Sequence, residues 1–90
     1  MPINVYRDVD GAPEVAWLCD ESWELPNQIE VLSKWIREEA AKLTDGPYVA
    51  DIGFLVRPDA SGGGAVLEPS IMKLLAEAEV SIFLSEYAGA

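Results

Sequence analysis

Hydrophobic and polar positions along the chain follow a helical period in its second quarter. One set of apolar residues recurs at steps of three and four: Ile29, Leu32, Ile36, Ala40 and Leu43. This spacing places the set on one face of a helix. Pro26 suits a first helical turn, and Gly46-Pro47 supplies a left-handed cap candidate followed by a stop. The pattern predicts a helix over Pro26–Leu43.

Strand-like patterns occur before and after this helix. Ile3–Arg7 and Glu14–Cys19 are β-prone runs, and an Asp-Gly pair and a proline between them are typical of a hairpin turn. Tyr48–Val56 alternates with both faces largely apolar, which favours a central strand. Val80–Tyr87 also alternates, with Phe83 and Tyr87 facing away from Val80, Ile82 and Leu84.

A second helix is expected over Pro69–Ala78, after a loop over Arg57–Ala65 that contains three consecutive glycines. The order ββαβαβ predicts an α+β two-layer sandwich, in which two helices cover one face of a four-stranded sheet. Ninety residues make a single domain over 1–90. The strands over Tyr48–Val56 and Val80–Tyr87 are expected to be neighbours, because a short helical crossover brings consecutive strands together.

The same periods predict which side chains are buried. The expected core comprises Ile29, Leu32, Ile36, Leu43, Ile52, Phe54, Leu74, Ile82 and Leu84. Trp17 alternates with Val15 and Cys19, and is expected to join this core.

The net charge of the chain excludes some classes of binding partner. Sixteen acidic residues against six basic ones, with no histidine, give a net charge of −10. Direct binding to nucleic acid or to an anionic membrane requires clustered Lys and Arg, so both are excluded as expected partners. A basic surface on another protein is the expected partner, since opposite fields accelerate encounter.

Composition indicates a cytoplasmic protein. The first residues lack the basic start and apolar core of a signal peptide, and no apolar run is long enough for a membrane span. One cysteine allows no internal disulfide, which fits a reducing compartment.

No reaction is expected from this chain. Without histidine, a Ser or Cys nucleophile lacks its usual base, and Glu38 and Glu39 are adjacent on the helix and point in different directions. The Asp8-x-Asp10-Gly11 segment fits a turn better than a calcium loop. Gly62-Gly63-Gly64 lacks the Lys-Ser/Thr pair of a phosphate loop, so it is interpreted as a flexible connector, with an anion site as the alternative. No cofactor, metal or catalytic residue is predicted.

Trp35 is the strongest candidate for a binding anchor. It lies about 100° from the centre of the apolar stripe, and Val31 lies one turn earlier on the same flank. Glu38 and Glu39 lie beside it. Either Trp35 covers the edge of the core, or it is an aromatic anchor for a partner or for a second copy of the chain. Trp23 and Glu24, in the loop before the helix, complete the predicted partner-binding set.

Several segments from Trp23 onward resemble the bacterial domain of unknown function 4279 family. They are the Ser22–Leu25 segment, the acidic helix with a central Trp, the glycines followed by Leu67–Ala76, and the ending Val80–Tyr87. The resemblance covers residues 23–88, and the family's opening strand and helix have no counterpart here. It implies a small cytoplasmic α+β domain, often with immunity-type roles in toxin systems, and brings no catalytic residues.

Three functions follow from these observations. The first is a non-enzymatic inhibitor or immunity-type protein that occupies a basic surface on a toxin or nuclease. The second is a phage-type anti-defence inhibitor that mimics nucleic acid, which rows of acidic charge would favour. The third is a small-ligand-binding domain that uses the glycine-rich loop 62–64.

Overall fold

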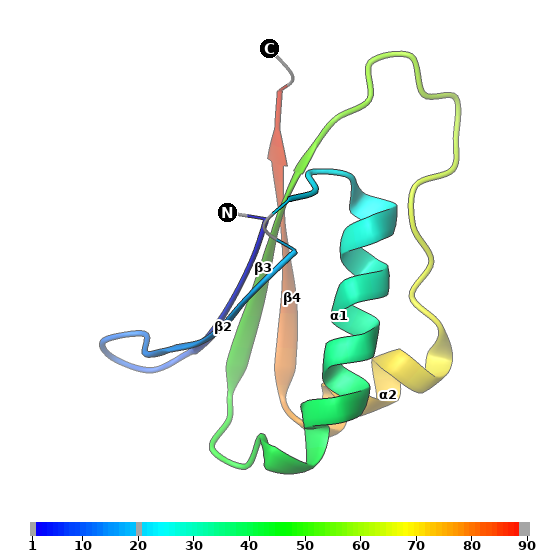
Figure 1. The fold of residues 1–90 in the computed structure, drawn as a ribbon. Helices are drawn as coiled ribbons and strands as arrows, with labels where there is room; N and C mark the ends of the chain where they lie inside the picture. Colours follow the sequence, from blue (N-terminus) through cyan, green and yellow to red (C-terminus); the bar gives the residue numbers. More distant parts are fainter. Residues whose placement is uncertain (1, 20, 89–90) are drawn as a thin grey trace.

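The computed structural model of the chain describes residues 2–19 and 21–88; residues 1, 20 and 89–90 lie outside the described part. It contains four strands, two α-helices and one short 3-10 helix (Figure 1). Their bounds are β1 Ile3–Arg7, β2 Glu14–Leu18, α1 Leu25–Glu39, the 3-10 turn Ala40–Lys42, β3 Tyr48–Leu55, α2 Pro69–Glu77 and β4 Val80–Tyr87. The predicted α+β class and the element order ββαβαβ are confirmed.

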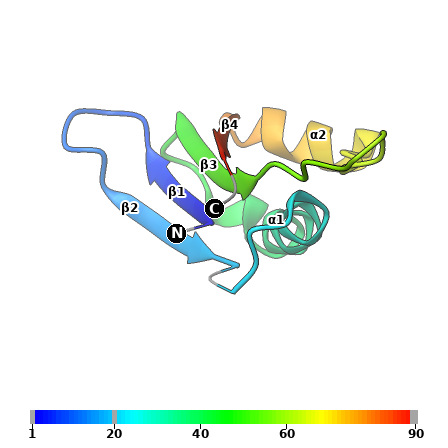
Figure 2. The same ribbon diagram turned by 90° about the horizontal axis from the view of Figure 1, so that it is seen from above.

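The sheet is mixed, with the strand order β2-β1-β3-β4. β1 pairs antiparallel with both β2 and β3, whereas β3 and β4 are parallel and are joined by the crossover through α2. β3 is therefore central, and it neighbours β4 as predicted. Viewed from above, both helices lie on the same side of the sheet (Figure 2). α1 packs against β3, and α2 packs against β4.

Strand register decides which side chains face the helices. Ile3 is opposite Ile52, and Val5 is opposite Ala50, so these four share the helix-covered face. Ile29, Leu32 and Ile36 of α1 and Ile71 and Leu75 of α2 pack onto the same cluster. The intervening residues of each strand face the other side of the sheet, which no helix covers (Figure 2). We call this side the open face.

The first helix ends earlier than the sequence indicates. α1 stops at Glu39 and tightens into a 3-10 turn over Ala40–Lys42, rather than continuing to Leu43. Gly46 is not a left-handed cap, because its φ lies outside the positive region. A close approach explains the glycine instead. A Cβ at Gly46 would lie 3.0 Å from the Cβ of Glu79 and 3.3 Å from the carbonyl oxygen of Ala78.

Two of the predicted core positions are wrong. Leu84 is 53% exposed, although it faces the helix side, because β4 is an edge strand and α2 lies beside its first half only (Figure 1). Trp17 is 45% exposed, because it pairs with Asn4 and therefore lies on the open face. The remaining predicted core residues are buried or half-buried.

Candidate protein-binding site

One flank of α1 carries three residues of the predicted binding set. Val31, Trp35 and Glu38 follow one another at steps of four and three, so they line one side of the helix. Val31 and Trp35 are half-buried, and Glu38 is exposed. Trp35 packs against the core cluster and still presents part of its side chain at the surface. The indole thus combines a fixed position with an exposed portion, as an anchor residue requires.

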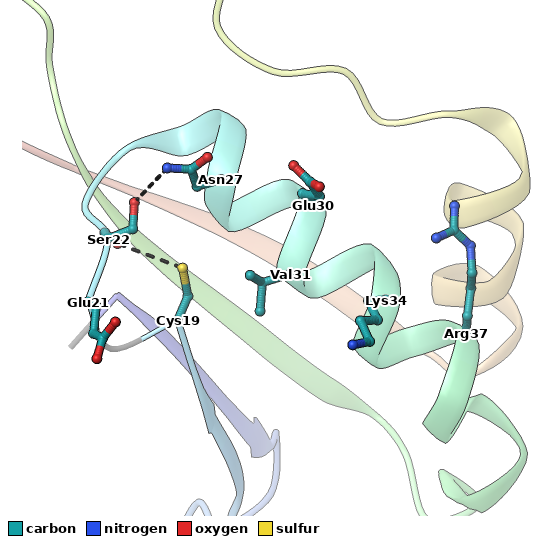
Figure 3. A pocket seen from close by; sticks show the side chains of 8 residues that line it. All are labelled: Cys19, Glu21, Ser22, Asn27, Glu30, Val31, Lys34 and Arg37. Atoms are coloured by element: carbon teal, nitrogen blue, oxygen red, sulfur yellow. Dashed lines mark hydrogen bonds between the residues drawn. The ribbon is translucent and has the colours of Figure 1, made fainter.

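A broad hollow of about 850 Å³ lies beside this flank. Figure 3 shows the Val31 side chain projecting from α1 into it. The lining residues come from the segment after β2 and from the outer side of α1: Cys19, Glu21, Ser22, Asn27, Glu30, Val31, Lys34 and Arg37. Two carboxylates and two cations share the lining, so the hollow is polar and mixed in charge.

Most acidic side chains of the described residues form no ion pair. Within the residues that the structure describes, one side-chain ion pair occurs, from Lys42 Nζ to Glu39 Oε2 at 3.0 Å. Glu39 is thus engaged within its own helix, whereas Glu38 beside Trp35 has no such pair. Both Glu38 and Trp35 can therefore meet a partner without first breaking an ion pair.

Trp23 and Glu24 occupy a different place. The Trp23 ring meets Tyr87 edge to face, with centroids 5.8 Å apart and planes at 88°. Its carbonyl accepts a hydrogen bond from the Leu55 N–H at 2.9 Å. Glu24 is the exposed residue before α1, and its carboxylate accepts a bond from Asn27 Nδ2 at 3.4 Å. At 1.5 Å per residue, Trp35 lies about 15 Å further along α1, so the structure does not join the two tryptophans into one spot.

Gln28 fixes the segment that leads into α1. Its side chain is fully buried, and Nε2 donates to the carbonyls of Ser22 at 2.9 Å and Gly53 at 2.7 Å. The amide therefore ties the loop that lines the hollow to the middle of the sheet. Sequence reasoning missed this residue. The available signal was its place one residue before Ile29 and four before Leu32, inside the apolar stripe.

The open face of the sheet was also missed as a surface. Phe83 is 59% exposed and Tyr87 is 44% exposed, and Leu55 next to Tyr87 is exposed as well. The alternation in Val80–Tyr87 already placed Phe83 and Tyr87 opposite the helix-facing residues. Combined with two helices on one face, that alternation was sufficient to predict their exposure.

The structure adds one observation against an anion site at the glycine loop. Gly62, Gly63 and Gly64 all have positive φ, which a glycine adopts readily. The Glu68 carboxylate stands at the start of α2, where its charge opposes anion binding, and it makes no capping hydrogen bond. Nor do the described residues bring together three side chains of the kind that ligate metals.

Comparisons with protein-family models, curated proteins and solved structures find no match to this chain. Across residues 2–19 and 21–88, no helix has both the length and the apolar character that crossing a membrane requires.

Proposed function

We propose that this chain is a non-enzymatic, acidic protein-binding domain of the inhibitor or immunity type. Its partner is a basic surface on a toxin or nuclease, met in the cytoplasm. The observation that carries the proposal is the net charge of −10 together with the single ion pair among the described side chains. The acidic field is thus directed at solvent, where it attracts a basic partner and accelerates encounter.

The flank of Val31, Trp35 and Glu38 is the proposed contact. A hot spot combines a large anchor in a fixed position with surrounding contacts that exclude water. Trp35 is positioned by the core behind it, and the hollow lined by Val31 lies alongside. Glu38 and Glu39 provide charge at the rim, where charge affects the association rate more than the dissociation rate. Trp23 and Glu24 form a second, smaller contact at the other end of α1.

The arrangement of charged residues along α1 favours this function over mimicry of nucleic acid. A mimic needs rows of negative charge at phosphate-like spacing. The outer side of α1 instead runs from Glu30 to Lys34 and Arg37, so two cations interrupt the row. The proposed immunity-type role also agrees with the resemblance to the domain of unknown function 4279 family, which we retain as part of this proposal.

Substitutions on the flank should separate the contribution of the Trp35 anchor from that of the Glu38 charge. We expect Trp35→Ala to raise the dissociation rate at least roughly thirtyfold, because a truncated anchor costs about 2 kcal/mol or more. Glu38→Lys should mainly lower the association rate. Surface plasmon resonance against the purified product of the neighbouring gene, at increasing salt, measures both rates.

Matched variants give this test its controls. Trp17→Ala removes an exposed tryptophan from the open face, and Glu14→Lys reverses an exposed charge on β2. Trp17→Ala should leave the dissociation rate unchanged, and Glu14→Lys should slow association less than Glu38→Lys. An association rate insensitive to salt, or equal effects of Trp35→Ala and Trp17→Ala, would contradict the proposal.

A further inference from the structure

β4 forms one free edge of the sheet. β4 has a neighbour on one side only, because it is last in the strand order. The carbonyls of Glu79 and Tyr87 accept hydrogen bonds from Tyr48 and Val56 at 2.8 and 3.1 Å, so the odd-numbered residues direct their carbonyls toward β3. In a regular strand the intervening residues direct theirs outward. The N–H and C=O groups of Ile82 and Leu84 therefore point away from β3, toward the free edge.

This edge lacks the features that normally prevent pairing. Val80–Tyr87 contains no lysine, arginine or proline and carries one charge, at Glu86. Its eight residues pair with β3 in an uninterrupted register. The opposite edge, β2, is five residues long, has a register shift opposite Val5 and Tyr6, and begins with the charged Glu14. Natural sheets usually protect an edge in the manner of β2, and a long apolar edge without such protection is a template for pairing with another chain.

Exposed apolar side chains accompany the free backbone on both faces of β4. Phe83 on the open face and Leu84 on the helix side are each more than half exposed. Val80 at the start of the strand is buried, because α2 lies beside that end. The uncovered part of the strand thus offers hydrogen-bonding groups and apolar area together, which is the combination that strand addition uses.

We propose that β4 pairs antiparallel with β4 of a second copy of this chain, about a two-fold axis at Phe83. This continues two four-stranded sheets into one of eight strands. The register is self-complementary: Ile82 meets Leu84, Ser81 meets Ser85, and Phe83 meets its own counterpart. Such a pairing places Ile82 opposite Leu84 on the helix side and Phe83 opposite its counterpart on the open face, with Val80 opposite Glu86 at the two ends. It uses the outward groups of Ile82 and Leu84 for hydrogen bonds.

The position of α2 favours a second copy. In the antiparallel arrangement, the C-terminal half of one β4 lies beside the N-terminal half of the other. Each exposed Leu84 is thereby brought to the part of the other copy where α2 and Ile82 lie. An isologous contact of this kind buries both Leu84 side chains at once.

A basic protein fits this edge poorly, which separates this inference from the proposed function. Seven of the eight β4 residues carry no charge, and Glu86 is the exception. The acidic partner-binding set lies on α1 and in the loop before it. The two surfaces also respond oppositely to salt. Two copies of net charge −10 repel each other, so screening should strengthen the dimer, whereas it should weaken binding of a basic partner.

Sedimentation of the purified chain over a range of concentrations tests the pairing. We expect a monomer–dimer equilibrium whose dissociation constant falls as salt rises. Leu84→Lys should raise that constant roughly a hundredfold or more, because it places charge at the centre of the edge. Val9→Lys, an exposed valine in the turn between β1 and β2 at the other side of the sheet, should leave it unchanged.

A cysteine variant tests the register independently of affinity. Phe83→Cys in a Cys19→Ser background should form a disulfide-linked dimer under oxidised glutathione, because a non-hydrogen-bonded antiparallel pair has Cα atoms about 4.5 Å apart, within disulfide range. Val9→Cys in the same background should remain monomeric. A wild-type chain that is monomeric at every concentration overturns the inference. So does a dimer that survives Leu84→Lys and is lost in Trp35→Ala, since it would use the α1 flank.

Discussion

Leu32→Ala is expected to lower the free energy of unfolding by about 2–5 kcal/mol. Leu32 is fully buried at the centre of α1, between the sheet and the rest of the core cluster. Truncation removes apolar contacts and leaves a cavity that a close-packed interior fills only in part. A domain of this size has roughly 5–15 kcal/mol of total stability, so the loss is a large fraction of it. The corresponding fall in melting temperature is about 10 °C or more.

Met72→Ala is the control for this substitution. Met72 is also on a helix, but it is 47% exposed and lies outside the core cluster. Its truncation should change stability by less than about 0.5 kcal/mol, as expected for a surface position. Urea denaturation followed by circular dichroism measures both variants. A near-silent Leu32→Ala would show that α1 is rotated relative to the arrangement described above.

Gln28→Leu is expected to lower the free energy of unfolding by about 1–3 kcal/mol, despite the gain of an apolar side chain. The substitution keeps the volume similar but removes the Nε2 donor. The carbonyls of Ser22 and Gly53 then lose that hydrogen bond beside an apolar side chain. Leaving the buried Gly53 carbonyl without this donor costs about 1–3 kcal/mol, whereas the part-buried Ser22 carbonyl still accepts a bond from Cys19 Sγ. The substitution should also destabilise the loop before α1 locally, because Gln28 ties this loop to β3.

Amide hydrogen exchange distinguishes the local loss of stability in Gln28→Leu from the global loss. The Leu55 N–H donates to the Trp23 carbonyl, so its exchange should accelerate in Gln28→Leu beyond the change in global stability. Asn27→Leu is the matched control. Asn27 is adjacent, but its amide donates on the exposed side to Ser22 Oγ at 3.2 Å, and its loss should cost well under 1 kcal/mol. Equal effects of the two substitutions would contradict the proposed role of Gln28.

The two proposed interaction surfaces use different physics. Binding at the α1 flank depends on acidic side chains that form no ion pair. Pairing at β4 depends on unpaired backbone groups and exposed apolar area. Their opposite expected responses to salt allow one titration series to separate them. A chain that dimerises through β4 still has its α1 flank free, because the flank lies on the helix and not at the sheet edge.

Local patterns along the sequence were sufficient to define the elements. The bounds of Ile3–Arg7 and Val80–Tyr87 agree with the structure, because alternation is a strong local signal over a short strand. The stripe of Ile29, Leu32 and Ile36 identified the buried side of α1 for the same reason. The Trp35 flank followed from the same helical period. The end of α1 was less predictable, since Ala40 and Leu43 fit both a helix and a 3-10 turn.

The tertiary structure alone decided what covers each element. The sequence by itself determined the α+β class, the helical stripe and the acidic surface, all of which depend on neighbours a few residues apart. It could not show that α2 leaves Leu84 uncovered, or that Gln28 reaches Gly53 across 25 positions. Nor could it reveal that β4 is an edge strand and Trp17 faces solvent. These features depend on strand order and on contacts between distant segments, and no local period in the chain encodes either.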